Sequence, residues 1–175
     1  MDTNKSAVKT YPAPPPLATP TDLSTARAGV VVKALNGLIA DTLALYMKTK
    51  NFHWHLFGPD FKEHHKLFDD QATQLFDGVD TLAERVRKIG GTTLRSISHV
   101  TALQQIKDDH DELVKPLEMM RRLLADNQHM VKSQRTAIDV CNAQRDVGSA
   151  NLLEGYLDES ERRVWFLFQI TQVVL

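Results

Sequence analysis

The sequence predicts an all-α protein built as a four-helix bundle, and two features of its pattern carry that prediction. Apolar side chains recur at spacings of three and four over four long stretches, which is the period of one helix face. No stretch alternates apolar and polar residues as a half-buried strand does. Long amphipathic helices in a chain of 175 residues are typical of a bundle with one shared core.

The chain is expected to divide into a flexible Pro-rich N-terminal arm over residues 1–22 and a helical domain over residues 23–175. Residues 11–16 of the arm are rich in proline, which removes backbone donors and favours extended geometry. The helical period begins near Ser24, and Gly58-Pro59 is expected to end the first helix. Its inward row is Val31, Leu35, Leu38, Thr42, Leu45, Thr49 and His53.

The second helix is expected to begin at Asp60, which with Glu63 resembles a capping box, and to end at Gly90-Gly91. Its apolar stripe is Phe68, Ala72, Leu75, Val79, Leu82, Val86 and Ile89. Residues 92–108 form a connection long enough to cross between helix pairs, with a short helix over residues 98–106.

The third helix is predicted to begin at Pro116, since proline suits the first turn of a helix, and to break at Gly148. Ser149 or Asn151 can start the fourth helix, which should end near Gln172.

Composition narrows the function classes. The formal net charge is −1, so binding to nucleic acid would need a local basic patch or tail. The single cysteine, Cys141, cannot form an internal disulfide, which fits a reducing cytoplasm. We expect no membrane association, because no uninterrupted apolar run has the length of a membrane span.

Two polar pairs on the second helix indicate a metal site. The N-terminal pair is His65 with Asp69, the C-terminal pair is Asp80 with Glu84, and each pair places its side chains one helical turn apart on one face. Imidazole and carboxylate ligands suit iron(II), manganese or zinc. One such pair alone is ordinarily a solvated surface; two on one face, with His53 just across the Gly58-Pro59 break, favour a site.

The two pairs cannot serve one ion within one chain. Asp69 and Asp80 are roughly 16 Å apart along an ideal helix, whereas metal–ligand bonds are about 2 Å. A two-fold axis near residues 74 and 75 would lay a second copy antiparallel and place the N-terminal pair of one chain opposite the C-terminal pair of the other. An isologous dimer would then hold two identical sites.

The sequence resembles the ferroxidase signature of the Dps family, the miniferritins of the ferritin-like superfamily. The matching residues, at matching intervals, are His53-Trp54, Gly58, Phe61, His65, Asp69, Asp80 and Ala83-Glu84-Arg85. The resemblance covers residues 24–172. It implies a ferritin-like bundle whose metal ligands are His53, His65 and Asp69 of one subunit with Asp80 and Glu84 of its dimer partner, and with Trp54 beside the site.

The same resemblance implies a function. We expect a dodecameric shell built from two-fold dimers, which oxidises Fe(II), preferentially with hydrogen peroxide, and stores ferric mineral. Zinc or manganese can occupy the same ligands. The resemblance implies a bacterial cytoplasmic protein that protects DNA from oxidative damage, with association with the nucleoid left open.

The rival interpretation is a structural DNA-compacting protein whose metal sites are vestigial or filled with zinc. The complete ligand set argues against it, and so does the arm, where Lys5 and Lys9 are the only basic candidates for DNA contact. Larger ferritins carry Glu-x-x-His motifs, which this sequence lacks. Candidate acidic residues for an iron-entry pore are Asp146, Glu154 and Asp158.

Overall fold

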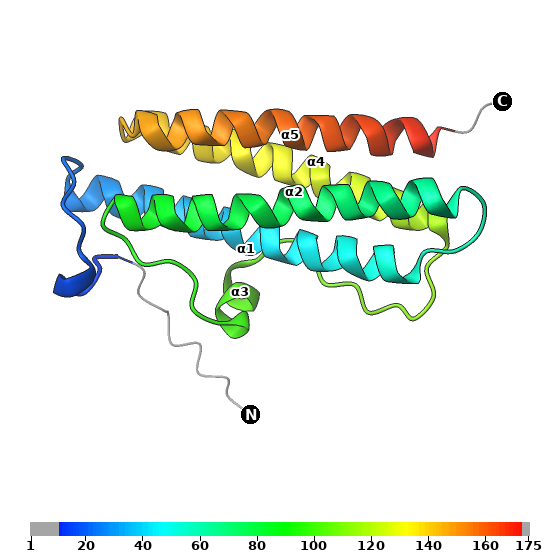
Figure 1. The fold of residues 1–175 in the computed structure, drawn as a ribbon. Helices are drawn as coiled ribbons and strands as arrows, with labels where there is room; N and C mark the ends of the chain where they lie inside the picture. The colour runs from blue at the N-terminus through cyan, green and yellow to red at the C-terminus, as the bar shows by residue number, and fades with distance from the viewer. Residues whose placement is uncertain (1–10, 173–175) are drawn as a thin grey trace.

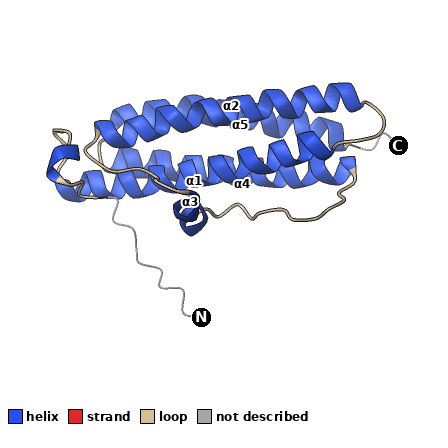
Figure 2. Ribbon diagram, turned by 60° about the horizontal axis from the view of Figure 1, so that its bottom comes forward, coloured by secondary structure: helices blue, strands red, loops and turns tan. Residues whose placement is uncertain are grey.

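Four long helices lie side by side in the computed structural model, which describes residues 11–172 (Figure 1). They are α1 (Thr25–His55), α2 (Phe61–Lys88), α4 (Pro116–Ala143) and α5 (Val147–Thr171). A short helix, α3 (Ile97–Leu103), lies outside the bundle against α1 (Figure 2). No strand occurs within residues 11–172. The predicted all-α, ferritin-like four-helix bundle, with its extra helix in the long connection, is confirmed.

The helices pair as two hairpins. The most extensive contacts join α1 to α2 and α4 to α5, and α1 packs on α4 to join the two pairs. The crossover from α2 to α4 carries α3 and runs along the outside of the bundle (Figures 1 and 2). This topology leaves the loop between α1 and α2 at one end of the molecule, where the candidate metal ligands His53, His65 and Asp69 are found.

The apolar rows predicted for α1 and α2 form the centre of the core. Every residue of the predicted α1 row is buried, including its polar members. The Thr42 and Thr49 hydroxyls donate to the carbonyl oxygens of Leu38 and Leu45, one turn earlier, at 2.8 Å each. These threonines are therefore satisfied inside an apolar environment. The largest fully buried side chains of the core include Phe52, Phe68, Leu35, Ile39, Met119 and Leu153.

Helix α1 is long and apolar enough to satisfy the length and hydropathy criteria of a membrane span, but 67% of its most apolar window is buried within the bundle. Burial against the other helices identifies it as the core helix of the bundle.

The expected capping box at the start of α2 is wrong. Asp60 adopts φ 57° and ψ 22°, and its side chain makes no capping hydrogen bond. A capping side chain requires extended backbone at that position, so the left-handed Asp60 cannot cap α2. The end of α2 is as predicted, since Gly90 has φ +79° directly after it.

The break between α4 and α5 precedes the predicted one. The chain turns at Arg145, with φ 63°, and Asp146 caps α5 by accepting the backbone N–H of Ser149 at 3.1 Å. Gly148 lies within the first turn of α5, where a Cβ would come within 2.8 Å of the Arg85 guanidinium. This glycine therefore allows a close approach to α2 instead of ending a helix.

Residues 11–22, the described part of the expected arm, contact the bundle. Pro15–Leu17 form a 3₁₀ helix, so the expected extended geometry is wrong for Pro15 and Pro16. The Arg87 guanidinium donates to the Leu17 carbonyl oxygen at 2.6 Å, and the Tyr11 ring packs on Gly29. Lys5 and Lys9 lie outside the described residues.

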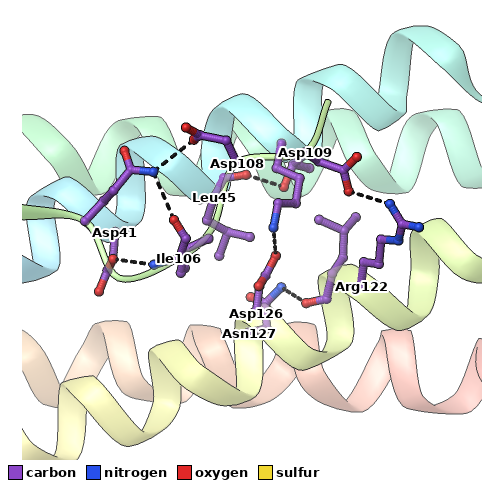
Figure 3. Close-up of polar contacts among 12 residues, drawn as sticks. Asp41, Leu45, Ile106, Asp108, Asp109, Arg122, Asp126 and Asn127 are labelled. Atoms are coloured by element: carbon purple, nitrogen blue, oxygen red, sulfur yellow. Dashed lines mark hydrogen bonds and ion pairs between the residues drawn. The ribbon is translucent and has the colours of Figure 1, made fainter. Parts of the chain in front are cut away.

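Carboxylates of α1 and α4 make polar contacts with the crossover and between the helices of the bundle (Figure 3). Asp41 of α1 accepts the backbone N–H groups of Gln105 and Ile106 at 2.5 and 3.0 Å. The Lys48 ammonium pairs with Asp126 at 2.6 Å, joining α1 to α4. The Asp41 contacts fix the path of the connection that follows α3, whereas the Lys48–Asp126 pair links two helices of the bundle.

Candidate metal centre

Two histidines meet at the hairpin between α1 and α2. His53 lies in the last turn of α1 and His65 lies near the start of α2, so the short loop between the helices brings them together. Their rings stack with centroids 3.7 Å apart and planes inclined by 23°. His53 is buried, His65 is half-buried, and Phe61 stacks on the outer side of His65 at 5.0 Å.

A reciprocal pair of hydrogen bonds orients both rings. His53 Nδ1 lies 2.9 Å from the backbone oxygen of His65, and His65 Nδ1 lies 3.0 Å from the backbone oxygen of His53. A carbonyl oxygen only accepts, so each Nδ1 must carry the proton and donate it. In the neutral form of each ring, Nε2 then carries a free lone pair. A metal-binding histidine requires this state.

Asp69 adds a carboxylate one turn beyond His65. Its Oδ1 lies 3.9 Å from His53 Nε2. The hydrogen bond from the Lys50 ammonium, at 2.8 Å, lowers the pKa of Asp69. The carboxylate is therefore ionised and ready to bind a cation.

Trp54 and Lys50 border this cluster. Trp54 is 57% exposed, and the Lys50 ammonium lies 5.9 Å from the centroid of its ring. The sequence analysis did not single out Lys50. Its position three residues before His53 and four before Trp54 is a helical spacing that could have identified it.

Asp80 and Glu84 lie elsewhere in the same chain. Both are exposed on α2, and Glu84 pairs with Lys88 at 3.4 Å. Asp80 follows Asp69 by roughly 16 Å of helix. Among residues 11–172 of one chain, no three His, Cys, Asp or Glu side chains come close enough to hold a metal ion together. The structure thus brings His53, His65 and Asp69 to one end of α2 and leaves the C-terminal pair apart from them.

Large apolar side chains stay uncovered near the cluster. Met47 and Trp54 of α1 and Phe61 and Phe76 of α2 are all exposed. The Phe76 ring contacts Tyr46 with centroids 5.1 Å apart. An uncovered apolar face on these two helices is typical of a surface that another protein covers.

The three candidate pore residues have different surroundings. Asp146 is buried, caps α5, and pairs with Arg85 of α2. Glu154 and Asp158 are exposed on α5. Arg85 also donates to the Ser149 hydroxyl at 2.9 Å. Asp146 therefore has a structural partner within the chain, whereas the other two carboxylates face outward.

Comparison with known proteins gives a consistent family. The family model described as a ferritin-like domain matches residues 32–173. A DNA protection during starvation protein of Agrobacterium fabrum is 31% identical over 149 residues, which are 85% of this chain and 92% of that protein. The chain belongs to the Dps family of ferritin-like proteins.

Solved structures agree with this membership. DpsC from Streptomyces coelicolor superposes with a TM-score of 0.86 at 26% identity, covering 90% of this chain and 92% of that one. A Dps protein from Vibrio cholerae, described as a member of a broad superfamily of ferritin-like diiron-carboxylate proteins, gives a TM-score of 0.83 at 29% identity, with 89% and 98% of the two chains covered.

Proposed function

We propose that this protein is a ferroxidase and iron-storage protein that binds Fe(II) at sites shared between two subunits. The observation that carries the proposal is the pair of imidazoles at the α1–α2 hairpin, both with Nε2 free and with an ionised carboxylate beside them. Membership of the Dps family supports iron as the metal, since a relative is described as a diiron-carboxylate protein.

The second half of each site comes from a partner chain in this proposal. The N-terminal half is His53, His65 and Asp69; the C-terminal half is Asp80 and Glu84 of a second copy related by a two-fold axis near the middle of α2. The exposure of both C-terminal carboxylates supports this arrangement, because neither is held in the core of its own chain. The exposed apolar side chains on α1 and α2 supply a surface for the dimer contact. Dimers of this kind build the proposed dodecameric shell.

The ligand chemistry favours oxidation. Carboxylate oxygens are hard donors and stabilise Fe(III) relative to Fe(II), while neutral imidazoles hold Fe(II) without adding charge. Two Fe(II) ions each lose one electron, and hydrogen peroxide accepts both electrons with two protons to form two water molecules. Consuming both reactants together keeps them from generating hydroxyl radical, which is how the protein would protect DNA. Zinc or manganese would compete for the same ligands.

Stopped-flow absorbance tests the proposal. Fe(II) is mixed with the purified shell and either hydrogen peroxide or oxygen in separate runs, and ferric absorbance is followed. We expect fast oxidation with peroxide and slower oxidation with oxygen. A His53→Ala/His65→Ala variant should lose the fast phase. Equal rates with and without protein would refute the ferroxidase assignment.

The rival function, DNA compaction without oxidation, has one observation in its favour: relatives are named for DNA protection. A gel shift across a salt series distinguishes it. We propose that DNA binding is weak and lost at physiological salt, because Lys5 and Lys9 release few counterions per chain. We also propose that the protein works in the bacterial cytoplasm. Glu154 and Asp158 are the proposed residues of an iron-entry pore.

A further inference from the structure

The interior of the bundle holds a positive charge that the proposed iron chemistry does not use. Arg163 of α5 is 4% exposed. Its Nε donates to Asn127 of α4 at 2.9 Å, its Nη1 to Gln74 of α2 at 3.4 Å, and its Nη2 to the Ser160 hydroxyl at 2.7 Å. Every acceptor is a neutral oxygen.

This guanidinium has no ionic partner within residues 11–172. Burial lowers its pKa to about 10, and Glu159, one turn earlier on α5, opposes that shift. At neutral pH Arg163 is still charged. Glu159 is exposed and forms no ion pair with it among the described residues. A buried charge is stable only when it is paired or fully hydrogen-bonded.

A small cavity adjoins the guanidinium. It has a volume of about 20 Å³, and its polar lining consists of Thr42, Gln74, Gln134, Tyr156, Glu159 and Arg163. Gln134 is buried, and one end of its side-chain amide has no hydrogen-bond partner. The unpartnered atom is the amide oxygen, and turning the amide by a half rotation would put its NH₂ group in that place as a donor.

We propose that this cavity, between α2, α4 and α5, binds one small monovalent anion of halide size. A guanidinium has five N–H groups, and three are used by Asn127, Gln74 and Ser160, so two remain for an anion. The Gln134 amide supplies a further donor. The volume exceeds the minimum of about 10–15 Å³ that a water-sized species needs, so the space fits one small ion.

The anion would neutralise the charge that the protein leaves unpaired. It would also join α4 and α5 through one set of hydrogen bonds, since its donors are Gln134 and Arg163. Glu159 stands at the same cavity and would repel an anion, which makes its removal a diagnostic change.

Anomalous scattering from crystals of the intact protein in sodium bromide tests the site directly. We expect one bromide peak within hydrogen-bond distance of the Arg163 guanidinium in each chain. A map that shows only water there, or Glu159 turned inward onto Arg163, overturns the proposal.

Thermal unfolding at constant ionic strength gives a second readout. Replacing sodium gluconate by sodium chloride at about ten times the Kd should raise the Tm by about 4 °C. Arg163→Met should abolish this increment. Arg162→Met, which removes the exposed neighbouring charge, should retain it. If Arg163→Met does not fold, Gln134→Leu should reduce the increment with Arg163 in place.

Glu159→Gln separates the anion from the alternative counter-charge. Removing the repelling carboxylate should enlarge the chloride increment. A destabilised Glu159→Gln protein with no chloride increment would identify Glu159 as the partner of Arg163 and refute the anion site.

Discussion

At the scale of single residues, Lys50 would compete with a metal ion for Asp69 in the proposed site. Its ammonium lies 2.8 Å from the Asp69 carboxylate, where a bound cation would repel it. A metal ion must therefore displace Lys50 before Asp69 can bind it. The cost of that displacement is modest because Asp69 is about half exposed.

Lys50→Met should strengthen metal binding. We expect Zn²⁺ affinity, measured by isothermal titration calorimetry on the intact protein, to rise about 1.5-fold to fivefold, the range of an exposed ion pair. Lys66→Met is the matched control, because Lys66 pairs with Asp70 on the same helix at 2.6 Å. Equal changes in the two variants would show that only the lost positive charge matters.

The sequence analysis named the candidate ligand residues from their type, their spacing and the family resemblance, but it could not supply their mutual orientation. It placed His53 just across the Gly58-Pro59 break from His65. It does not predict that each ring donates to the other's backbone, because that contact depends on the exact path of residues 56–60. Lys50 was missed for a related reason: a lysine on a helix face is ordinarily solvated.

At the scale of elements, α3 carries a buried histidine whose contribution to stability depends on pH. His99 is buried, and neither ring nitrogen has a hydrogen-bond partner among the described residues. Burial lowers its pKa, and the nearby Arg95 charge adds to the effect. Since the unfolded chain binds the proton more tightly, the stability that neutral His99 contributes is present above its unfolded pKa and is lost as pH falls toward its lower folded pKa.

His99→Leu should reduce the loss of stability at low pH. Between pH 7.5 and 5.5, the Tm of the wild-type protein should fall more than that of the variant, with a difference equivalent to about 1 kcal/mol. Differential scanning calorimetry at the two pH values measures it. His110→Leu, which replaces an exposed histidine in the loop after α3, is the control.

Two glycines give a matched test of helix packing. A Cβ on Gly91 would lie 2.5 Å from a methyl carbon of Val32, whereas one on Gly155 would meet nothing within 4 Å. Gly91→Ala should lower the free energy of unfolding by about 1–3 kcal/mol through overpacking. Gly155→Ala, within α5, should raise it by about 0.5–1 kcal/mol. Chemical denaturation of both variants measures the difference, and a stabilised Gly91→Ala would contradict the packing shown here.

Which segments form helices was predictable from the sequence, whereas the residues at which the helices begin and end were less predictable. The apolar rows of α1 and α2 follow directly from periodicity. The α4–α5 turn was misplaced because Gly148 resembles a helix terminator, although its small size serves the approach of Arg85. The capping prediction at Asp60 failed because sequence spacing does not reveal a left-handed backbone.

At the scale of the whole molecule, the shared site is the central proposal, and subunit mixing tests it. The His65→Ala/Asp69→Ala and Asp80→Ala/Glu84→Ala proteins should each lose rapid Fe(II) oxidation while remaining folded, since these side chains lie off the core. After subunit exchange, a mixed dimer would have one site with all four ligands removed and one intact. Stopped-flow measurements should therefore recover part of the activity.

The parents and the exchange itself are the controls. Mass spectrometry of the intact complexes verifies that the subunits have mixed, and light scattering verifies that each parent assembles. A mixture that is as inactive as its parents, despite verified exchange, would mean that each site is built within one subunit.

The separation of the two site halves along α2 has a consequence for the timing of iron oxidation. Each chain carries both halves, yet the distance between them keeps the chain from closing a site on itself. A newly made monomer would then be chemically silent toward Fe(II). Oxidation would start only when two subunits associate. Insoluble ferric product would therefore not form before assembly of the shell has begun. Fe(II) oxidation would thus depend on subunit association, and dilution that separates the subunits would stop it.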